Sequence, residues 1–213
     1  MNFSSLLFPP RCIGCDQWLD ALGSSPWICA ACRGSLHFLK VPAFCPRLKK
    51  QYFEEAHAPF AFEGLVLDWI HQYKYFRKFY VLREMVSFLK QAPLDWNSYD
   101  VLVPVPLHWR RQMVRGFNPA FLLAHELGKK IEKPVCHFLK RKHSTPQQTK
   151  LPLEQRLENV AGAFDLRKNL PQNAMLLLID DVLTTGTTAN ECAKALKKGG
   201  AKKVDVLTLA RTL

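Results

Sequence analysis

The sequence predicts an α/β protein with a doubly wound, mostly parallel sheet, preceded by a small zinc module with four cysteine ligands. Apolar runs of strand length alternate with helical patterns from about residue 56 onward, which is typical of that sheet. One run, Met175–Ile179, is apolar throughout, as expected of a central strand covered on both faces. Two Cys-x-x-Cys pairs near the start indicate the module. We expect the module over residues 1–50 and the sheet domain over residues 51–213.

Composition and length are typical of a soluble globular protein. The 213 residues are 48% hydrophobic and 23% charged, so disorder along the whole chain is excluded. No run approaches the ~18 apolar residues that a membrane-spanning helix needs. The first ten residues lack the basic start and apolar core of a secretory signal. We therefore expect a cytoplasmic protein that is not integral to the membrane.

The N-terminal cysteines predict a metal site. Four of them form two pairs of identical spacing with thirteen residues between the pairs: Cys12, Cys15, Cys29 and Cys32. Disulfides are rare in a reducing compartment, and two such pairs can offer four thiolates to one tetrahedral zinc. The segment has few periodic apolar positions, so a metal is needed to hold it together. The sequence leaves open whether Cys45 forms a second site with His37 or His57.

The sheet domain begins with a strand and two helices. Residues 58–62 have the pattern of a short strand. Apolar side chains then recur at helical spacing in two stretches: Val66, Trp69, Ile70 and Tyr73, then Leu82, Met85, Val86 and Leu89. Each set lies on one face of a helix, so two helices packed against the sheet are expected.

The middle of the chain predicts two strands around a capped helix. Residues 100–106 form an apolar run ended by two prolines, which indicates a buried strand. Asn118 then provides an N-cap, with proline at the first helical position, for a helix that ends near Lys130. Residues 135–139 predict another strand. The polar, basic stretch 140–158 predicts a loop with a helix only in its latter half.

The last third predicts a strand, a helix and a strand. After Met175–Ile179, an apolar stripe marks one face of a helix: Ala189, Cys192, Ala193 and Leu196. Gly199 and Gly200 end this helix, and residues 204–209 return as a strand. This alternation implies a doubly wound sheet.

Residues 178–188 predict a phosphate site. An apolar strand leads into Asp180 and Asp181, then into a turn of threonines around Gly186, then into the helix. Backbone N–H groups at the start of a helix lack intrahelical partners and form an anion seat. Hydroxyls that can wrap one terminal phosphate come from four residues: Thr184, Thr185, Thr187 and Thr188. The acids can accept hydrogen bonds from vicinal sugar hydroxyls. A sugar phosphate therefore fits, whereas the Walker A and dinucleotide motifs are absent.

The charge distribution indicates a phosphate-bearing ligand of some kind. The formal net charge is +12, and residues 99–160 hold eleven Lys or Arg against five Asp or Glu. Such a region attracts the phosphates of a small ligand or of a nucleic-acid backbone alike. Charge alone does not choose between them.

Residues 178–188 closely resemble the signature of type I phosphoribosyltransferases, which bind 5-phosphoribosyl 1-pyrophosphate (PRPP). The resemblance implies that Asp180 and Asp181 hold the ribose hydroxyls and that Thr184 to Thr188 cradle the 5-phosphate. It also implies Mg²⁺ that bridges pyrophosphate and ribose oxygens. The pyrophosphate and basic loop would comprise Pro106, Leu107, Arg110, Arg111 and Arg115. A mobile loop would close over the site with Arg141, Lys142, Gln148 and Arg156.

Most of the chain looks like the competence protein F (ComF) family. The resemblance rests on the zinc knuckles and on three further runs: Pro-Val-Pro-Leu-His at 104–108, Arg-Gly-Phe-Asn at 115–118 and Asn-Val-Ala-Gly-Ala-Phe at 159–164. Pro119 stands where the family usually has glutamine. Leu48 stands where many members have cysteine, which suggests one metal rather than two. The resemblance implies a cytosolic factor of natural transformation that handles incoming single-stranded DNA, with proteins of the DNA-uptake machinery as further partners.

Two functions stay open. The chain either binds PRPP and handles DNA, or is an active phosphoribosyltransferase that transfers phosphoribosyl to an unidentified acceptor and does not bind DNA. No catalytic residue is assigned. For DNA, bases would stack on Trp109, which we place in a polar loop, on Phe117 or on a cluster of further aromatic residues: Tyr73, Tyr75, Phe76, Phe79 and Tyr80. Because these five recur at helical spacing, most of them are expected in the core. Whether the zinc module binds DNA, binds protein or is only structural stays open.

Overall fold

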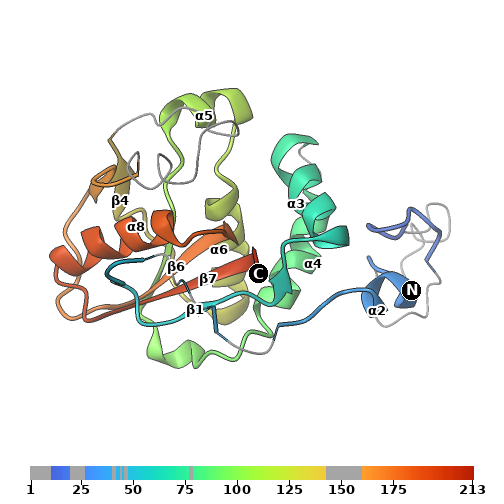
Figure 1. Cartoon of the computed structure of the whole chain (residues 1–213), viewed down its shortest axis with the longest axis horizontal. Coiled ribbons are helices and arrows are strands. Elements are labelled where there is room, and N and C mark those ends of the chain that lie inside the picture. The colour runs from blue at the N-terminus through green and yellow to red at the C-terminus, as the bar shows by residue number, and fades with distance from the viewer. Residues whose placement is uncertain are drawn as a thin grey trace.

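The computed structural model describes residues 11–19, 27–39, 42–43, 45, 48–76, 79–142 and 160–213. The α/β body carries the N-terminal module at one side (Figure 1). Gln148, Arg156 and the helix expected within 140–158 lie outside the described residues, as does the side chain of Arg110.

The main sheet has five parallel strands in the order β1-β7-β6-β3, with β2 also paired to β7. Its strands are β1 (Ala56–His57), β2 (Phe60–Ala61), β3 (Val101–Pro104), β6 (Met175–Leu183) and β7 (Lys203–Arg211). Val135 adds an isolated parallel bridge to Leu102 at the β3 edge. A separate antiparallel pair joins β4 (Leu139–Arg141) to β5 (Phe164–Leu166).

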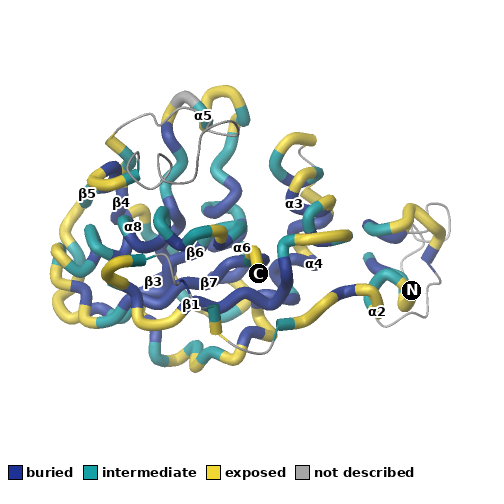
Figure 2. The backbone as a smooth tube through the Cα atoms, viewed as in Figure 1, coloured by how far each residue is buried: buried dark blue, intermediate teal, exposed yellow. Residues whose placement is uncertain are grey.

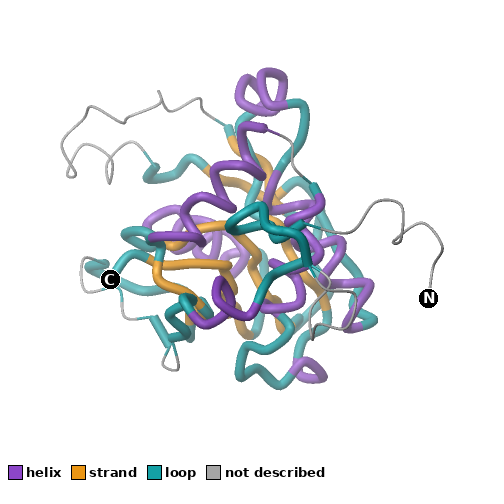
Figure 3. Tube along the Cα trace, turned by 90° about the vertical axis from the view of Figure 1, so that its right-hand side faces the viewer, coloured by secondary structure: helices purple, strands orange, loops and turns teal. Residues whose placement is uncertain are grey.

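Helices cover both faces of the main sheet, which confirms the predicted fold class (Figure 3). The principal helices are α3 (Gly64–Phe76), α4 (Tyr80–Leu89), α5 (Trp109–Arg115), α6 (Pro119–Ile131) and α8 (Thr187–Lys198), with short α2 (Ala30–Gly34) and a 3-10 turn (Trp96–Ser98). Leu177 and Ile179 of β6 pack with α3, α4 and α6, while Leu176 and Leu178 pack with α8. Alternation along a strand covered on both faces explains the uninterrupted apolar run.

Burial follows the predicted stripes (Figure 2). All eight apolar positions proposed for the first two helices are buried, as are all four proposed for α8. The predicted cap of α6 is also present: Asn118 Oδ1 accepts a hydrogen bond from Ala120 N at 3.1 Å, and Asn118 Nδ2 donates to the Val105 carbonyl at 3.0 Å.

Four local predictions were wrong in part. Of the strand expected over 58–62, only Phe60 and Ala61 form β2, and β1 precedes that range; in 135–139 only Val135 bridges before β4 begins at Leu139. Trp109 begins α5 rather than lying in a loop. The two acids lie inside β6, which continues to Leu183. Hydrogen bonding to the neighbouring strand, which local apolarity does not reveal, sets these boundaries.

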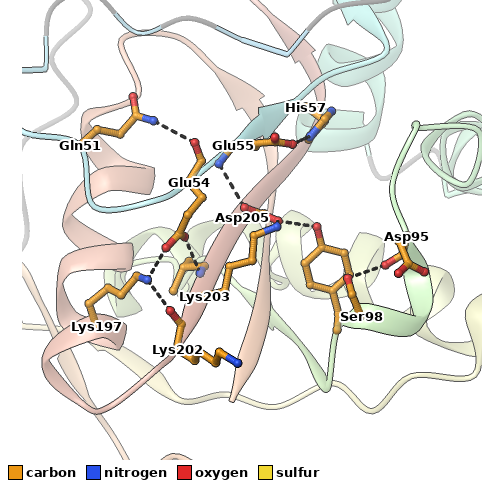
Figure 4. Close-up of polar contacts among 12 residues, drawn as sticks. Gln51, Glu54, Glu55, His57, Asp95, Ser98, Lys197, Lys202, Lys203 and Asp205 are labelled. Atoms are coloured by element: carbon orange, nitrogen blue, oxygen red, sulfur yellow. Dashed lines mark hydrogen bonds and ion pairs between the residues drawn. The ribbon is translucent and has the colours of Figure 1, made fainter. Parts of the chain in front are cut away.

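A polar network closes the amino end of the sheet (Figure 4). Buried Asp205 accepts hydrogen bonds from Tyr99 Oη at 2.6 Å and from Glu55 N at 3.1 Å, and it pairs with Lys203 Nζ at 2.6 Å. Burial and the carboxylate of Asp205 raise the pKa of Tyr99. Each oxygen of Asp205 has a partner, so this buried acid is structural. The predicted phosphate site lies at the opposite, carboxyl end.

No helix among the described residues is both long and apolar enough to cross a membrane.

Candidate functional site

Two neighbouring acids mark the carboxyl end of β6. Asp180 lies opposite Thr208 of β7, and Asp181 N donates a hydrogen bond to Asp180 Oδ1 at 2.9 Å. Because side chains alternate along a strand, Asp181 points to the α3 side of the sheet and Asp180 to the α8 side. The pair therefore straddles the edge where a ligand of a parallel sheet binds.

The surroundings of Asp180 favour its neutral form. Burial, followed by the negative charge of Asp181, raises the pKa of Asp180 to about 7. The Asp181 N–H and the positive charges of Lys74 and Arg141 oppose this rise. Asp180 therefore gains and loses its proton near neutral pH. Its charged neighbours are one other acid, Asp181, and two basic residues, Lys74 and Arg141.

The turn between β6 and α8 has the geometry that the sequence predicts. Gly186 is the N-cap of α8 with φ +77°, a left-handed conformation that favours glycine. The hydroxyls of Thr185 and Thr187 are 2.9 Å apart, and Thr187 N donates to Thr185 Oγ1 at 3.4 Å. Thr184 is exposed and Thr188 half-buried. The first N–H groups of a twelve-residue helix and a set of hydroxyls thus gather at one point beside the acids.

Cys45 packs directly behind this turn. A Cβ placed on Gly186 would lie 2.7 Å from Cys45 Sγ, so the thiol occupies the space that any other residue at 186 would need. The histidines considered as partners of Cys45 bind acids instead: His37 pairs with Glu63 at 3.0 Å and His57 with Glu55 at 2.9 Å. Within the described ranges, the four N-terminal cysteines form the sole cluster of metal-ligating residues, so no second site is seen there.

The loop after β3 brings the predicted pyrophosphate segment beside the acids. Val105 N donates to the Ile179 carbonyl at 2.9 Å, one residue before Asp180. Pro106 and Leu107 follow, both half-buried. Arg115, at the end of α5, lies with its guanidinium 5.1 Å from the ring centre of Tyr75.

Arg141 and Arg111 converge on the α8 side of the pair. Burial and then the charge of Arg111 lower the pKa of Arg141, while the charges of Cys192 and Asp180 oppose this. The Arg141 guanidinium also lies 5.3 Å from the ring centre of Phe164. Lys142 is turned elsewhere, since it pairs with Asp165 at 3.0 Å.

Lys74 is a site residue that the sequence reasoning missed. Its Nζ lies 2.7 Å from Asp181 Oδ1, and the two side chains are only 17% and 14% exposed. Next to it, Tyr73 donates from its hydroxyl to the Pro119 carbonyl at 2.9 Å. Burial and the charge of Asp181 raise the pKa of Tyr73, whereas Arg115 opposes the rise. The only local signal in the sequence was that Lys74 adjoins a tyrosine expected in the core. The partner of Lys74, Asp181, lies 107 residues further along the chain.

The four N-terminal cysteines form a cluster that fits a structural zinc. The sulfurs of Cys12, Cys15, Cys29 and Cys32 all lie within 4.8 Å of one another. The Cys15 and Cys29 sulfurs are 3.8 Å apart, about the edge of a tetrahedron with zinc–sulfur bonds of about 2.3 Å. Burial raises the pKa of Cys12, but the N–H groups of Cys29, Cys15 and Gly14 outweigh it and lower the pKa to about 6. Such N–H groups favour thiolate, the form that binds metal.

The cysteine module packs on α3. Trp69 Nε1 of α3 donates to the Ile13 carbonyl at 3.1 Å. Apolar residues of the module join the same core as α3 and α4: Cys12, Ile13, Leu19, Ile28 and Leu36. α3 thus contacts the module at Trp69 and the acid pair at Lys74.

Comparison with known protein families gives two matches along the chain. The family "Phosphoribosyl transferase domain" matches residues 82–212, more than half of the chain. The family "Double zinc ribbon domain" matches residues 3–61.

Individual relatives carry names connected with DNA. Competence protein F of Haemophilus influenzae is 34% identical over 151 residues, which cover 67% of this chain and 66% of that protein. DNA utilization protein YhgH of Salmonella typhimurium is 35% identical over 160 residues, which cover 68% and 66%. The chain thus spans slightly less than two thirds of these relatives' length. A purine phosphoribosyltransferase from Pyrococcus horikoshii superposes with a TM-score of 0.40 at 19% identity, covering 62% of this chain and 72% of that chain.

The two domain matches and the identity to these relatives agree with the parallel sheet and the four-cysteine cluster. The chain belongs to the competence protein F (ComF/YhgH) family, in which a phosphoribosyl transferase domain follows an N-terminal double zinc ribbon.

Proposed function

We propose that the chain binds PRPP at the carboxyl end of β6 and acts in the cytoplasm in the uptake or use of DNA, where it handles single strands. The observation that carries the PRPP assignment is the turn around Gly186. Its φ of +77° directs the start of α8 toward the strand end, beside Asp180 and Asp181. A phosphate seat next to two acids suits a phosphorylated sugar.

Each part of PRPP has complementary groups nearby. The 5-phosphate would lie against the N–H groups and hydroxyls of residues 184–188. The ribose hydroxyls would donate hydrogen bonds to the two acids at the carboxyl end of β6. Asp180 and Asp181 would accept them from opposite faces of the sheet. The pyrophosphate would lie toward Arg141, whose charge acts on Asp180, and toward Arg111, whose charge acts on Arg141.

The acid pair also fits Mg²⁺, since carboxylates are the ligands that this ion prefers. Asp180 or Asp181 would hold the ion through water or directly, and the ion would offset the charge of the pyrophosphate. Asp181 already has a counter-charge in Lys74, so binding a cation there requires this ion pair to open.

The role in DNA uptake rests on the relatives, whose names are competence protein F and DNA utilization protein. The net charge of +12 supports an anionic polymer as partner. Partners in the uptake machinery belong to the same proposal.

Transfer of phosphoribosyl is the second candidate. Preorganised positive charge at Arg111 and Arg141 is what a departing pyrophosphate needs. Pyrophosphate release measured with ammonia, nucleobases or DNA ends would separate this reaction from binding alone. Release with any of them favours an enzyme, and no release with all of them favours a binder.

Calorimetry with PRPP and Mg²⁺ tests the ligand. We expect saturable heat in the native chain and none in the double variant Asp180→Asn, Asp181→Asn. The matched control is Asp165→Asn, which removes an acid on β5 that pairs with Lys142 and should leave the heat unchanged. Heat that survives the double variant, or its absence in the native chain, rejects the assignment.

A further inference from the structure

Five large aromatic side chains are exposed near the end of α3, at the start of α4 and at the start of α5. We call them the aromatic rim: Tyr75, Phe76, Phe79, Tyr80 and Trp109. The sequence reasoning expected the first four in the core, and this was wrong, while Tyr73 is buried as expected. Trp109 is exposed, although it starts a helix.

The rim residues are exposed because the α3–α4 hairpin extends past its own core stripe. The buried face of α3 ends at Tyr73, and that of α4 begins at Val81. The aromatic residues between them belong to neither face. Figure 1 shows the far end of α3 and helix α5 at the same end of the molecule, above the sheet.

Three contacts join the rim to the proposed site. Lys74, which precedes Tyr75, pairs with Asp181 at 2.7 Å. The guanidinium of Arg115 lies 5.1 Å from the Tyr75 ring centre. Phe79 meets Phe117 edge to face at 5.1 Å between ring centres. Tyr75 thus contacts α5 through Arg115, and its neighbour Lys74 contacts the acid pair.

Cations accompany these rings. Arg111 and Arg115 lie on α5, which Trp109 begins. Exposed rings in a positively charged setting are the features of surfaces that bind single-stranded nucleic acid, where bases stack on rings and phosphates meet cations.

We propose that the aromatic rim binds single-stranded nucleic acid and holds the strand at the mouth of the PRPP site. The proposed function states that the chain handles single strands of DNA, and the rim is the surface where such a strand would bind. The rim proposal rests on that function only for the identity of the strand as DNA. It does not depend on PRPP binding, because none of its rings belongs to the phosphate turn or the acid pair.

The test is fluorescence-anisotropy titration of the full chain with a labelled oligo-dT. Trp109→Ala should weaken binding roughly 5- to 150-fold, the range that about 1–3 kcal/mol per stacked base corresponds to. Trp18→Ala is the matched control, since Trp18 is 60% exposed and Trp109 57%, but Trp18 lies on the cysteine module over Arg11. Trp109→Phe should keep the affinity because it keeps a ring.

A second variant removes a ring but keeps apolar area. Phe76→Leu should weaken oligo-dT binding by a similar factor, because leucine cannot stack. Equal affinity in the native chain, Trp109→Ala and Phe76→Leu would overturn the proposal. A fall in Trp18→Ala alone would overturn it in favour of the cysteine module. Concentration-dependent dimerisation that Trp109→Ala abolishes, without strand binding, would overturn the proposal and assign the rim to a second copy of the chain.

The same titration separates this proposal from PRPP binding. Asp180→Asn with Asp181→Asn should retain the strand affinity even where PRPP heat is lost. Strand binding without PRPP heat in the native chain would leave the rim assignment standing and reject the PRPP assignment. If PRPP gives heat but the rim variants do not change the affinity for oligo-dT, the PRPP assignment stands and the rim assignment is rejected.

Discussion

Lys74 Nζ lies 2.7 Å from Asp181 Oδ1, so helix α3 places a cation beside an acid near the carboxyl end of β6. Both side chains are mostly buried, which makes this pair unlike the surface ion pairs elsewhere in the chain. Removal of one partner leaves the other as an uncompensated charge in a partly dry site.

We expect Lys74→Met to lower the free energy of unfolding by about 1–3 kcal/mol, because Asp181 loses its counter-charge. Lys129→Met is the control: its pair with Glu126 is 2.8 Å long but largely exposed, and its loss should cost below about 1 kcal/mol. Urea unfolding of both variants measures the difference. Equal losses would show that the Lys74 pair has no more weight than a surface pair.

We expect Gly186→Ala to destabilise the chain more than Gly162→Ala. Both glycines have positive φ, +77° and +67°, but only at Gly186 does a Cβ meet another atom, Cys45 Sγ at 2.7 Å. The conformational cost of about 1 kcal/mol is shared, and the clash adds about 1–3 kcal/mol. Adding Cys45→Ala to Gly186→Ala should recover part of the loss. No recovery would mean that the thiol does not constrain the turn.

Asp180 should make stability depend on pH between about 4 and about 7. Its pKa is raised from 3.8 to about 7, so the folded chain keeps a proton that the unfolded chain has lost. Its contribution to stability is therefore greatest below pH 4 and falls as pH rises to about 7. The native chain should lose stability relative to Asp180→Asn across this window, as measured by urea unfolding. For Asp165, whose pKa Lys142 lowers from 3.8, the native chain should instead gain stability relative to Asp165→Asn as pH rises, and this change should lie below pH about 4. A constant difference between the native chain and Asp180→Asn contradicts the raised pKa.

The native chain should hold about one zinc ion, and Cys15→Ser should release it and lower the melting temperature. Cys136→Ser is the control, because Cys136 lies on the sheet domain outside the cluster. Zinc content by a colorimetric chelator and thermal unfolding measure both effects. Zinc loss in Cys136→Ser as well would show that the four clustered thiols are not the ligand set.

The parts of the fold that local chemistry specifies were predictable. The cap at Asn118 and the buried stripe of α8 depend on residues within one or two turns of each other, and both are confirmed. The apolar β6 run and the two cysteine pairs are equally local signals. The positive φ of Gly186 follows from its place between a strand and a helix.

The features that the sequence did not predict depend on how distant elements of the chain pack together. Helical spacing suggests that Phe76 and Phe79 are buried, but the hairpin carries them beyond the sheet that would cover them. Lys74 has the appearance of an ordinary solvent-facing lysine until α3 is placed beside β6. Asp180 and Asp181 belong to the strand because β7 continues past them, and nothing in residues 178–188 indicates how long that neighbour is.

Helix α3 bonds the cysteine module at Trp69 and the acid pair at Lys74, about 7.5 Å apart along its axis. A rigid connection over so short a span makes metal loading and sugar-phosphate affinity linked quantities, and linkage acts equally in both directions. Protein saturated with PRPP should then hold the ion more tightly in an equilibrium competition with a chelator, and the metal-free chain should bind PRPP more weakly by the same factor.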